Sequence, residues 1–213
     1  MNNNIYISKY CKINRFGVSV NNETIYQPTN EFTFAEYMKD AFKQQGFNYL
    51  KYFKMDNISK LGFLTTEILL KSTNLKEKYT NEEIGVIISN SNSTLDTDND
   101  FNQTIIDREN YFPSPSVFVY TLPNIMIGEI CIKNKIQGES TFFISEKFNA
   151  DLTCSMVSNL LKSEKTKACI AGWVDLSVGV KEFDSFLMLI EKGKSENLIE
   201  FNKENLNKLH QIK

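Results

Sequence analysis

The stretch from Val117 to Trp173 constrains the fold of this chain more than any other. Apolar residues recur near helical spacing over residues 121–136, and Gly138 follows as a stop signal. Residues Thr141–Ser145 are aromatic and β-branched, which favours a buried strand. A second helix and then a strand over Lys167–Ala171 follow, and the crossover helix makes the two strands parallel. The apolar stripe of the second helix consists of Leu152, Met156, Leu160 and Leu161.

Three further strands are expected. Residues 5–10 alternate in polarity, while Glu83–Asn90 and Asp184–Lys192 are almost continuously apolar. With the two strands above, they predict an α/β fold whose mixed five-stranded sheet has helices on both faces, in the element order β-α-β-α-β-α-β-β. The 213 residues are enough for one such domain, 1–213. We expect its charged tail, residues 193–213, to end in a short helix and to fray in part.

Two more helices precede the central stretch. A short run of apolar residues at helical spacing predicts a helix over Phe34–Gln44, which ends at Gly46. A longer amphipathic pattern covers residues 57–73, and either Asp56 or Asn57 is a suitable N-cap for it.

Three polar segments lie between these elements. The Ser/Asn cluster Ser89–Ser93 follows a strand and fits two interpretations, a phosphate cradle made of backbone amides or a surface loop, and the loop is the commoner. Residues 94–110 are rich in aspartate but lack the glycine and final glutamate of a calcium loop, which predicts a solvated loop. Residues 21–31, rich in Asn, Thr and Pro, also predict a loop.

Composition excludes several classes of function. The net charge of −2, without clustered Lys and Arg, argues against nucleic-acid binding. No apolar run approaches the roughly 20 residues of a membrane span, and the first ten residues lack a signal peptide's apolar region, so we expect a cytoplasmic protein. The single histidine, His210, leaves no candidate for a catalytic triad, and we expect neither metal nor cofactor. The cysteines show no paired spacing: Cys11, Cys131, Cys154 and Cys169.

The sequence TLPNIMIGEICIKNKIQGE, followed by a strand, a helix and IAGWVD, resembles the N-terminal half of a β-ketoacyl synthase of the thiolase-like fold. The resemblance extends over residues 53–192, because KMD with its following helix, EIGVIISN and DSFLMLIEK occur in the family's order. In the family, a second half carries the histidines, or histidine and asparagine, that activate the carbonyl group. No repeat of the first half is found in this sequence.

The resemblance places Lys147 where the family has its nucleophilic cysteine. In the family this residue lies at the N-terminus of a buried helix, and counting from Gly138 or from Ala171-Gly172 reaches the same position. A helix N-terminus favours a thiolate and disfavours an ammonium group. The other interpretation is a slip in the alignment that leaves Lys147 as a solvated residue at the helix start. However, no cysteine lies within six residues of it.

The sequence thus lacks both the family's nucleophilic cysteine and its second half. By resemblance, these two deficits imply a non-catalytic β-ketoacyl-synthase-like accessory protein in fatty-acid or polyketide-type biosynthesis. The small, partial form resembles proteins of aryl-polyene or flexirubin pigment clusters. The implied partners are a second copy or a full-length ketosynthase, and an acyl carrier protein. In the family the strand before the nucleophile pairs across a two-fold axis, which implies a symmetric dimer. Its seam would consist of Thr141, Phe142, Phe143, Ile144 and Ser145.

Two other functions are open at this stage. The chain could be an enzyme in which Lys147, beside Glu146, forms a Schiff base, provided that burial makes its amine neutral. Alternatively, a second polypeptide supplies the missing half, so that this chain is one part of a split ketosynthase or acyltransferase. Lys147 argues against that, because the nucleophile belongs to this half.

Overall fold

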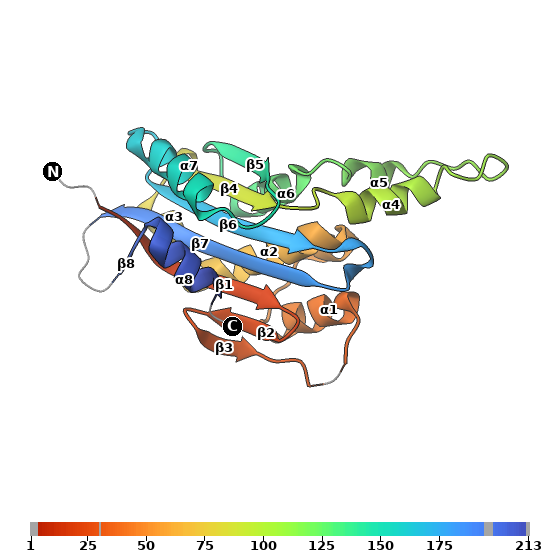
Figure 1. The fold of residues 1–213 in the computed structure, drawn as a ribbon, viewed down its shortest axis with the longest axis horizontal. Helices are drawn as coiled ribbons and strands as arrows, with labels where there is room; N and C mark the ends of the chain where they lie inside the picture. Colours follow the sequence, from red (N-terminus) through yellow and green to blue (C-terminus); the bar gives the residue numbers. More distant parts are fainter. Residues whose placement is uncertain (1–3, 30, 194–197, 212–213) are drawn as a thin grey trace.

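The computed structural model describes residues 4–29, 31–193 and 198–211, and its centre is a mixed eight-stranded sheet (Figure 1). The strands lie in the order β3-β2-β1-β7-β6-β4-β5, and β8 pairs with β1. Their bounds are β1 (Asn4–Asn14), β2 (Gly17–Val20), β3 (Glu23–Tyr26), β4 (Ile84–Asn90), β5 (Ser140–Ile144), β6 (Ala168–Leu176), β7 (Phe183–Gly193) and β8 (Ile199–Glu200).

Five of these strands form the mixed sheet that the sequence predicts. β5 and β6 both run parallel to β4, which lies between them, and β7 is antiparallel to β6 and to β1. The predicted parallel relation of β5 and β6 is therefore confirmed, and so is the predicted order of strands and helices around this five-stranded part.

The sheet is wider than predicted because β2 and β3 extend it beyond β1. The predicted loop over residues 21–31 was wrong in its first half, where β3 forms a hairpin with β2. Asn21 and Asn22 connect the two strands with positive φ angles of 49° and 68°. Asparagine tolerates this conformation, and a two-residue turn of this kind favours a hairpin, so the signal was present in the sequence.

The helices lie on both faces of the sheet, as predicted. In the described residues they are α1 (Phe34–Gln44), α2 (Asn57–Leu70), α3 (Leu75–Lys78), α4 (Leu95–Gln103), α5 (Pro115–Val119), α6 (Ile125–Asn134), α7 (Ala150–Lys162) and α8 (Lys203–Gln211). Three short 3₁₀ turns add η1 (Leu50–Lys54), η2 (Asn81–Glu83) and η3 (Val178–Val180). Asp56 caps α2, accepting a hydrogen bond from the Ser59 amide at 3.1 Å.

Alternate residues of the central strands serve two separate cores. In β7, Leu187 and Leu189 belong to the core beneath α1, α2 and α6, whereas Phe186, Met188 and Ile190 belong to the core beneath α7 and α8. Figure 1 shows α7 and α8 on one face and α2 on the other. Because both faces are covered, the strands carry apolar residues at nearly every position.

One helix prediction and one loop prediction need correction. The helix expected over residues 121–136 begins at Ile125 and ends at Asn134, where Lys135 adopts the left-handed conformation with φ 55°. Gly138 is not the stop. A Cβ atom there would lie 2.3 Å from the Ile84 carbonyl oxygen, so this glycine permits close approach to the start of β4.

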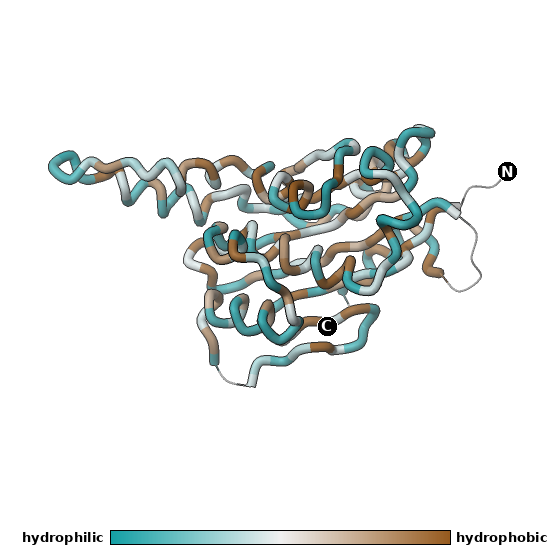
Figure 2. The backbone as a smooth tube through the Cα atoms, turned by 180° about the vertical axis from the view of Figure 1, so that it is seen from behind, coloured by the Kyte–Doolittle hydropathy of each residue, from teal (hydrophilic) through white to brown (hydrophobic). Residues whose placement is uncertain are grey.

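The second correction concerns residues 94–110, which are not simply a solvated loop because they contain α4. This helix, a turn and α5 form an arm, defined as residues 95–122, that projects beyond the sheet (Figure 1). Seen from behind, hydrophobic and hydrophilic segments alternate along it (Figure 2).

The tail is folded where the structure describes it. Leu206 and Leu209 of α8 are buried in the second core, and β8 pairs with β1. Residues 194–197 and 212–213 of the predicted tail lie outside the described residues. Among the helices that the structure describes, none has the length and apolarity needed to cross a membrane.

Candidate functional site

The loop between β5 and α7 holds the residue that the sequence singles out. Asn149 caps α7 by accepting a hydrogen bond from the Leu152 amide at 3.0 Å, so Lys147 precedes the cap by two residues. Both Lys147 and Glu146 are exposed. The burial that a Schiff-base lysine needs is therefore absent at this position.

The loop rests on the C-terminal helix through one aromatic side chain. The Phe148 ring packs against the rings of His210 and Phe186, with centroid distances of 4.6 and 5.7 Å, and those two rings are 5.6 Å apart. His210 Nε2 lies 3.1 Å from Asp184 Oδ2. Sequence reasoning missed this cluster, because its members come from a loop, a strand and a helix far apart in the chain. A cavity of about 560 Å³ separates the loop from Lys203 and Asn207 of α8.

The thiols of this chain are unsuited to nucleophilic attack at neutral pH. Burial raises the pKa of Cys154, in α7, to about 11, and it has the same effect on Cys131. Cys11 and Cys169 are fully buried, and burial raises the pKa of each still further. The thiolate is the nucleophilic form, so none of these side chains has the activation that a condensing cysteine shows.

The Ser/Asn turn after β4 is held by a carboxylate of the chain itself. Asp175 Oδ1, near the end of β6, accepts hydrogen bonds from the amides of Ser91 and Asn92 at 3.0 and 3.2 Å. Its Oδ2 accepts another from Ser91 Oγ at 2.7 Å. The amides that would cradle a phosphate are thus already occupied, which leaves the phosphate interpretation without its donors.

Replacing Asp175 by alanine is expected to lower the free energy of unfolding by about 2 kcal/mol, because two half-buried amides lose their charged acceptor. Urea unfolding followed by circular dichroism measures this loss. Asp151→Ala is the matched control, since its ion pair with Lys203 lies at the exposed surface and contributes little. Equal losses in the two variants would contradict the role given to Asp175.

The base of the arm is tied to the body by partly buried and exposed polar contacts. Asp96 accepts hydrogen bonds from Asn57 Nδ2 at 2.8 Å and from the Gly179 amide at 2.7 Å. Thr97 Oγ1 donates to Asp56 Oδ2 at 2.6 Å. These contacts fix the arm's direction, and burial raises the pKa of Asp56 above its ordinary value.

A second set of contacts ties α6 to the arm and to η1. Glu129 is buried and accepts a hydrogen bond from Tyr120 Oη at 3.0 Å. Its other oxygen lies 2.7 Å from Lys51 Nζ but off the direction of a hydrogen bond, so that contact is an ion pair. Burial, and then the neighbouring Glu129 carboxylate, raise the pKa of Tyr120.

The raised pKa of Asp56 predicts a pH effect with a definite sign. Because its folded-state pKa lies above the unfolded value, ionisation on raising the pH removes stability in the window that begins near the ordinary carboxyl pKa. Asp56→Asn abolishes this titration, so the variant should gain stability relative to the natural chain as the pH rises. Thermal unfolding from pH 3 to pH 8 checks it, and a constant difference between the two proteins would refute it.

Apolar side chains remain exposed on the arm and on the neighbouring edge strand. β5 lies at the edge of the sheet and is not the buried strand that the sequence predicts. Ile144 is 60% exposed, and Phe112, between α4 and α5 of the arm, is 82% exposed. Phe142 and Phe143 are half-buried against the first and the second core respectively. The arm's exposed large apolar residues are Leu95, Ile106, Tyr111, Phe112, Phe118, Val119 and Leu122.

Comparison with solved structures agrees with this architecture, although no protein-family model and no curated protein matches the sequence. The chain is similar to the ishigamide ketosynthase/chain length factor, with a TM-score of 0.63, 13% identity, and coverage of 92% of this chain and 64% of that one. The chain has the thiolase-like fold of the ketosynthases. It also resembles a ketosynthase in complex with its chain length factor from Xenorhabdus doucetiae, with a TM-score of 0.55, 12% identity, and coverage of 90% and 80%.

A third ketosynthase-fold structure is a β-ketoacyl synthase from Burkholderia phymatum STM815. Its TM-score is 0.59 at 9% identity, and the match covers 90% of this chain and 59% of that one. The chain therefore spans less than two thirds of the ishigamide and Burkholderia chains that it matches. At these identities the ketosynthase likeness concerns the fold, and the activity has to be argued from the residues of this chain.

Proposed function

We propose that this chain is a non-catalytic ketosynthase-like accessory subunit, acting in the cytoplasm in fatty-acid or polyketide-type assembly. The proposal rests on Lys147, which the sequence resemblance puts at the position of the family's nucleophilic cysteine and which is exposed in the loop before α7. The raised pKa of the nearby Cys154 thiol, about 11, gives further support, because no activated thiol replaces the missing one.

The partner we propose is another ketosynthase-type subunit, either a full-length ketosynthase or a second copy. In the described part of the chain no strand pairs with the outer edge of β5, and the arm, which carries exposed apolar residues, projects beyond the end of the sheet on the side of β5 (Figure 1). Two of the similar structures are described as pairing a ketosynthase with a chain length factor, which supports an accessory role. We also propose that residues Thr141–Ser145 form the seam of this pairing and that an acyl carrier protein is a transient partner. The aryl-polyene or flexirubin pigment pathways are the proposed setting.

Two measurements on the purified full chain test the proposal. Light scattering at micromolar concentration should give a dimer, either alone or after co-expression with the ketosynthase of the same source. A malonyl-thioester decarboxylation assay should give no turnover by the chain alone. A monomer that fails to associate with that ketosynthase, or turnover by the chain alone, would overturn it.

Two alternative functions predict different products in the same preparation: an enzyme that uses Lys147 as an amine nucleophile, and one half of a split ketosynthase or acyltransferase. Borohydride treatment with a ketone or aldehyde, followed by peptide mass spectrometry, would place a reduced adduct on Lys147 if that lysine forms a Schiff base. An acyl group found on this chain after incubation of the complex with acyl thioester would support the split enzyme. Our proposal expects neither product.

A further inference from the structure

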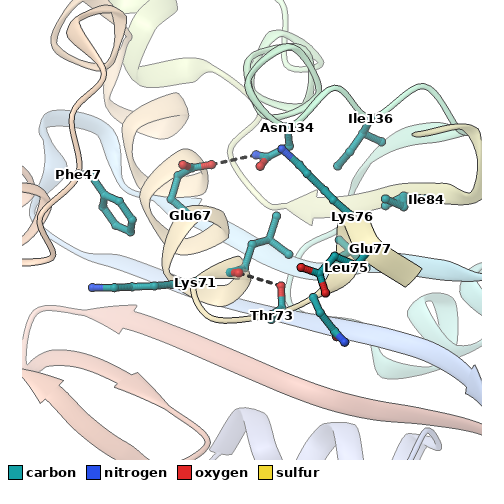
Figure 3. A pocket seen from close by; sticks show the side chains of 12 residues that line it. Phe47, Glu67, Lys71, Thr73, Leu75, Lys76, Glu77, Ile84, Asn134 and Ile136 are labelled. Carbon is teal, nitrogen blue, oxygen red and sulfur yellow. Dashed lines mark hydrogen bonds between the residues drawn. The ribbon is translucent and has the colours of Figure 1, made fainter. Parts of the chain in front are cut away.

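Figure 3 shows a smaller cavity, which lies beside the start of β4, whereas the Lys147 loop lies beside the end of β4. β4 begins beside this cavity at Ile84 and ends at Asn90, whose carbonyl oxygen accepts a hydrogen bond from the Ser145 amide. The volume is about 310 Å³, which is at the lower end for small-molecule sites. The apolar walls come from Phe47, Leu70, Leu75, Ile84 and Ile136.

One polar side chain of the lining has an unused acceptor. Asn134 is only 8% exposed, and its Nδ2 donates to Glu67 Oε1 at 2.9 Å and to the Ile130 carbonyl oxygen at 3.2 Å. Both neighbours are acceptors, so the nitrogen must face them, and the amide oxygen is left for the cavity. Within the described residues no donor reaches this oxygen. This oxygen is accessible from the cavity, so a ligand or a water molecule can donate a hydrogen bond to it.

The electrostatics of the cavity favour a positive group. α2 and α6 both end at the cavity, with Leu70 and Asn134, and a helix C-terminus carries partial negative charge. The carboxylate of Glu67 adds a full negative charge next to Asn134. An ammonium group is the natural complement of such acceptors, because it supplies several donors together with a positive charge.

The lysines of the cavity differ in their availability. Lys71 Nζ donates to the Gln45 carbonyl oxygen at 2.9 Å and lies 5.6 Å from the centroid of the Phe47 ring, so it is held at the rim. Lys76 is exposed on α3, and its side chain extends across the cavity toward Asn134 (Figure 3). Among the described residues it has no hydrogen bond or ion pair, and an incoming cation can displace it at little cost.

We propose that this cavity binds a small organic amine that carries a compact apolar body. The ammonium group lies on Glu67 and Asn134 Oδ1, and the apolar body contacts Phe47, Leu70 and Ile136. The site is independent of the proposed accessory role, because it is formed by one protomer at the opposite end of β4 from the loop after β5.

Titration of 2-phenylethylamine into the full chain, followed by amide NMR, tests the site. We expect saturable shifts at the cavity residues with a dissociation constant on the order of 1 mM, as befits a ligand of this size. The matched probe is 3-phenylpropanoate, which has a similar body and the opposite charge. It should bind about tenfold more weakly or not at all.

Three variants decide between this site and non-specific binding. Glu67→Gln should weaken amine binding about tenfold, since a charge-assisted hydrogen bond is lost. Lys76→Gln should tighten it a few-fold by removing the competing cation, and it is an exposed change that leaves folding intact. Lys181→Gln, an exposed lysine elsewhere, should change nothing. Equal binding of the carboxylate, or weaker amine binding by Lys76→Gln, would overturn the proposal.

Discussion

Replacing Gly172 by alanine is expected to lower the free energy of unfolding by about 4 kcal/mol, which is most of the stability of a marginally stable domain. Gly172 lies in β6 with φ +151°, and an added Cβ atom would lie 2.0 Å from the carbonyl oxygen of Phe186 in β7. That oxygen belongs to a backbone fixed by the β6–β7 ladder, where Gly172 faces Leu187. A fixed backbone atom cannot move aside as a flexible side chain would, so the clash must open the ladder.

Two other glycines separate the clash from the effect of backbone conformation. Gly128→Ala lies in α6 with open space around the new Cβ, and it should stabilise the chain by about 0.5–1 kcal/mol through helix propensity. Gly179→Ala also has open space but keeps φ +68°, so it should cost about 1 kcal/mol. Urea unfolding of the three variants gives the order of their free energies of unfolding. If Gly172→Ala proves no worse than Gly179→Ala, the clash with Phe186 is not the cause.

The five strands β1, β4, β5, β6 and β7 could be predicted because their signals are local. β4 and β7 are continuous apolar runs, and the strands on either side of α7 carry the pattern of a parallel crossover. α4 could not be predicted in the same way, since the sequence DTDND has low helix propensity. Its helical form depends on contacts with distant residues, including the Asn57 side chain and the Gly179 amide, which both bind Asp96. A local window of sequence does not contain those partners.

The candidate site, too, could be predicted only where its signals are local in the sequence. The resemblance identified Lys147 as the position to examine, and the absence of a nearby cysteine is visible in the sequence. The packing of Phe148 against His210 is not visible, because these residues come together only when α8 folds onto the loop. Exposure of β5 was also missed, since aromatic and β-branched residues favour strands without indicating whether a strand lies at the centre or the edge of a sheet.

Replacing Ile144 by proline is expected to abolish self-association through β5 while leaving the fold intact. Two contacts set the direction of the strand's backbone groups. The Glu139 carbonyl oxygen accepts from Val86, and the Ser145 amide donates to Asn90, so the odd-numbered residues bond to β4. Backbone groups alternate along a strand, and the amide of Ile144 therefore points to the free edge. Proline at this position removes the outward donor without breaking the ladder with β4.

The expected change in the dissociation constant follows from the symmetry of the proposed dimer. A two-fold axis places each substitution in the seam twice, so two hydrogen bonds of about 1 kcal/mol each are lost, together with the close approach of the strands. The dissociation constant should rise about a hundredfold or more, measured by analytical ultracentrifugation over a concentration series. Ile144→Ala is the matched control, because it removes a similar apolar side chain but keeps the amide. Wild-type association of the proline variant would exclude β5 as the seam and leave the arm as the surface that holds the partner.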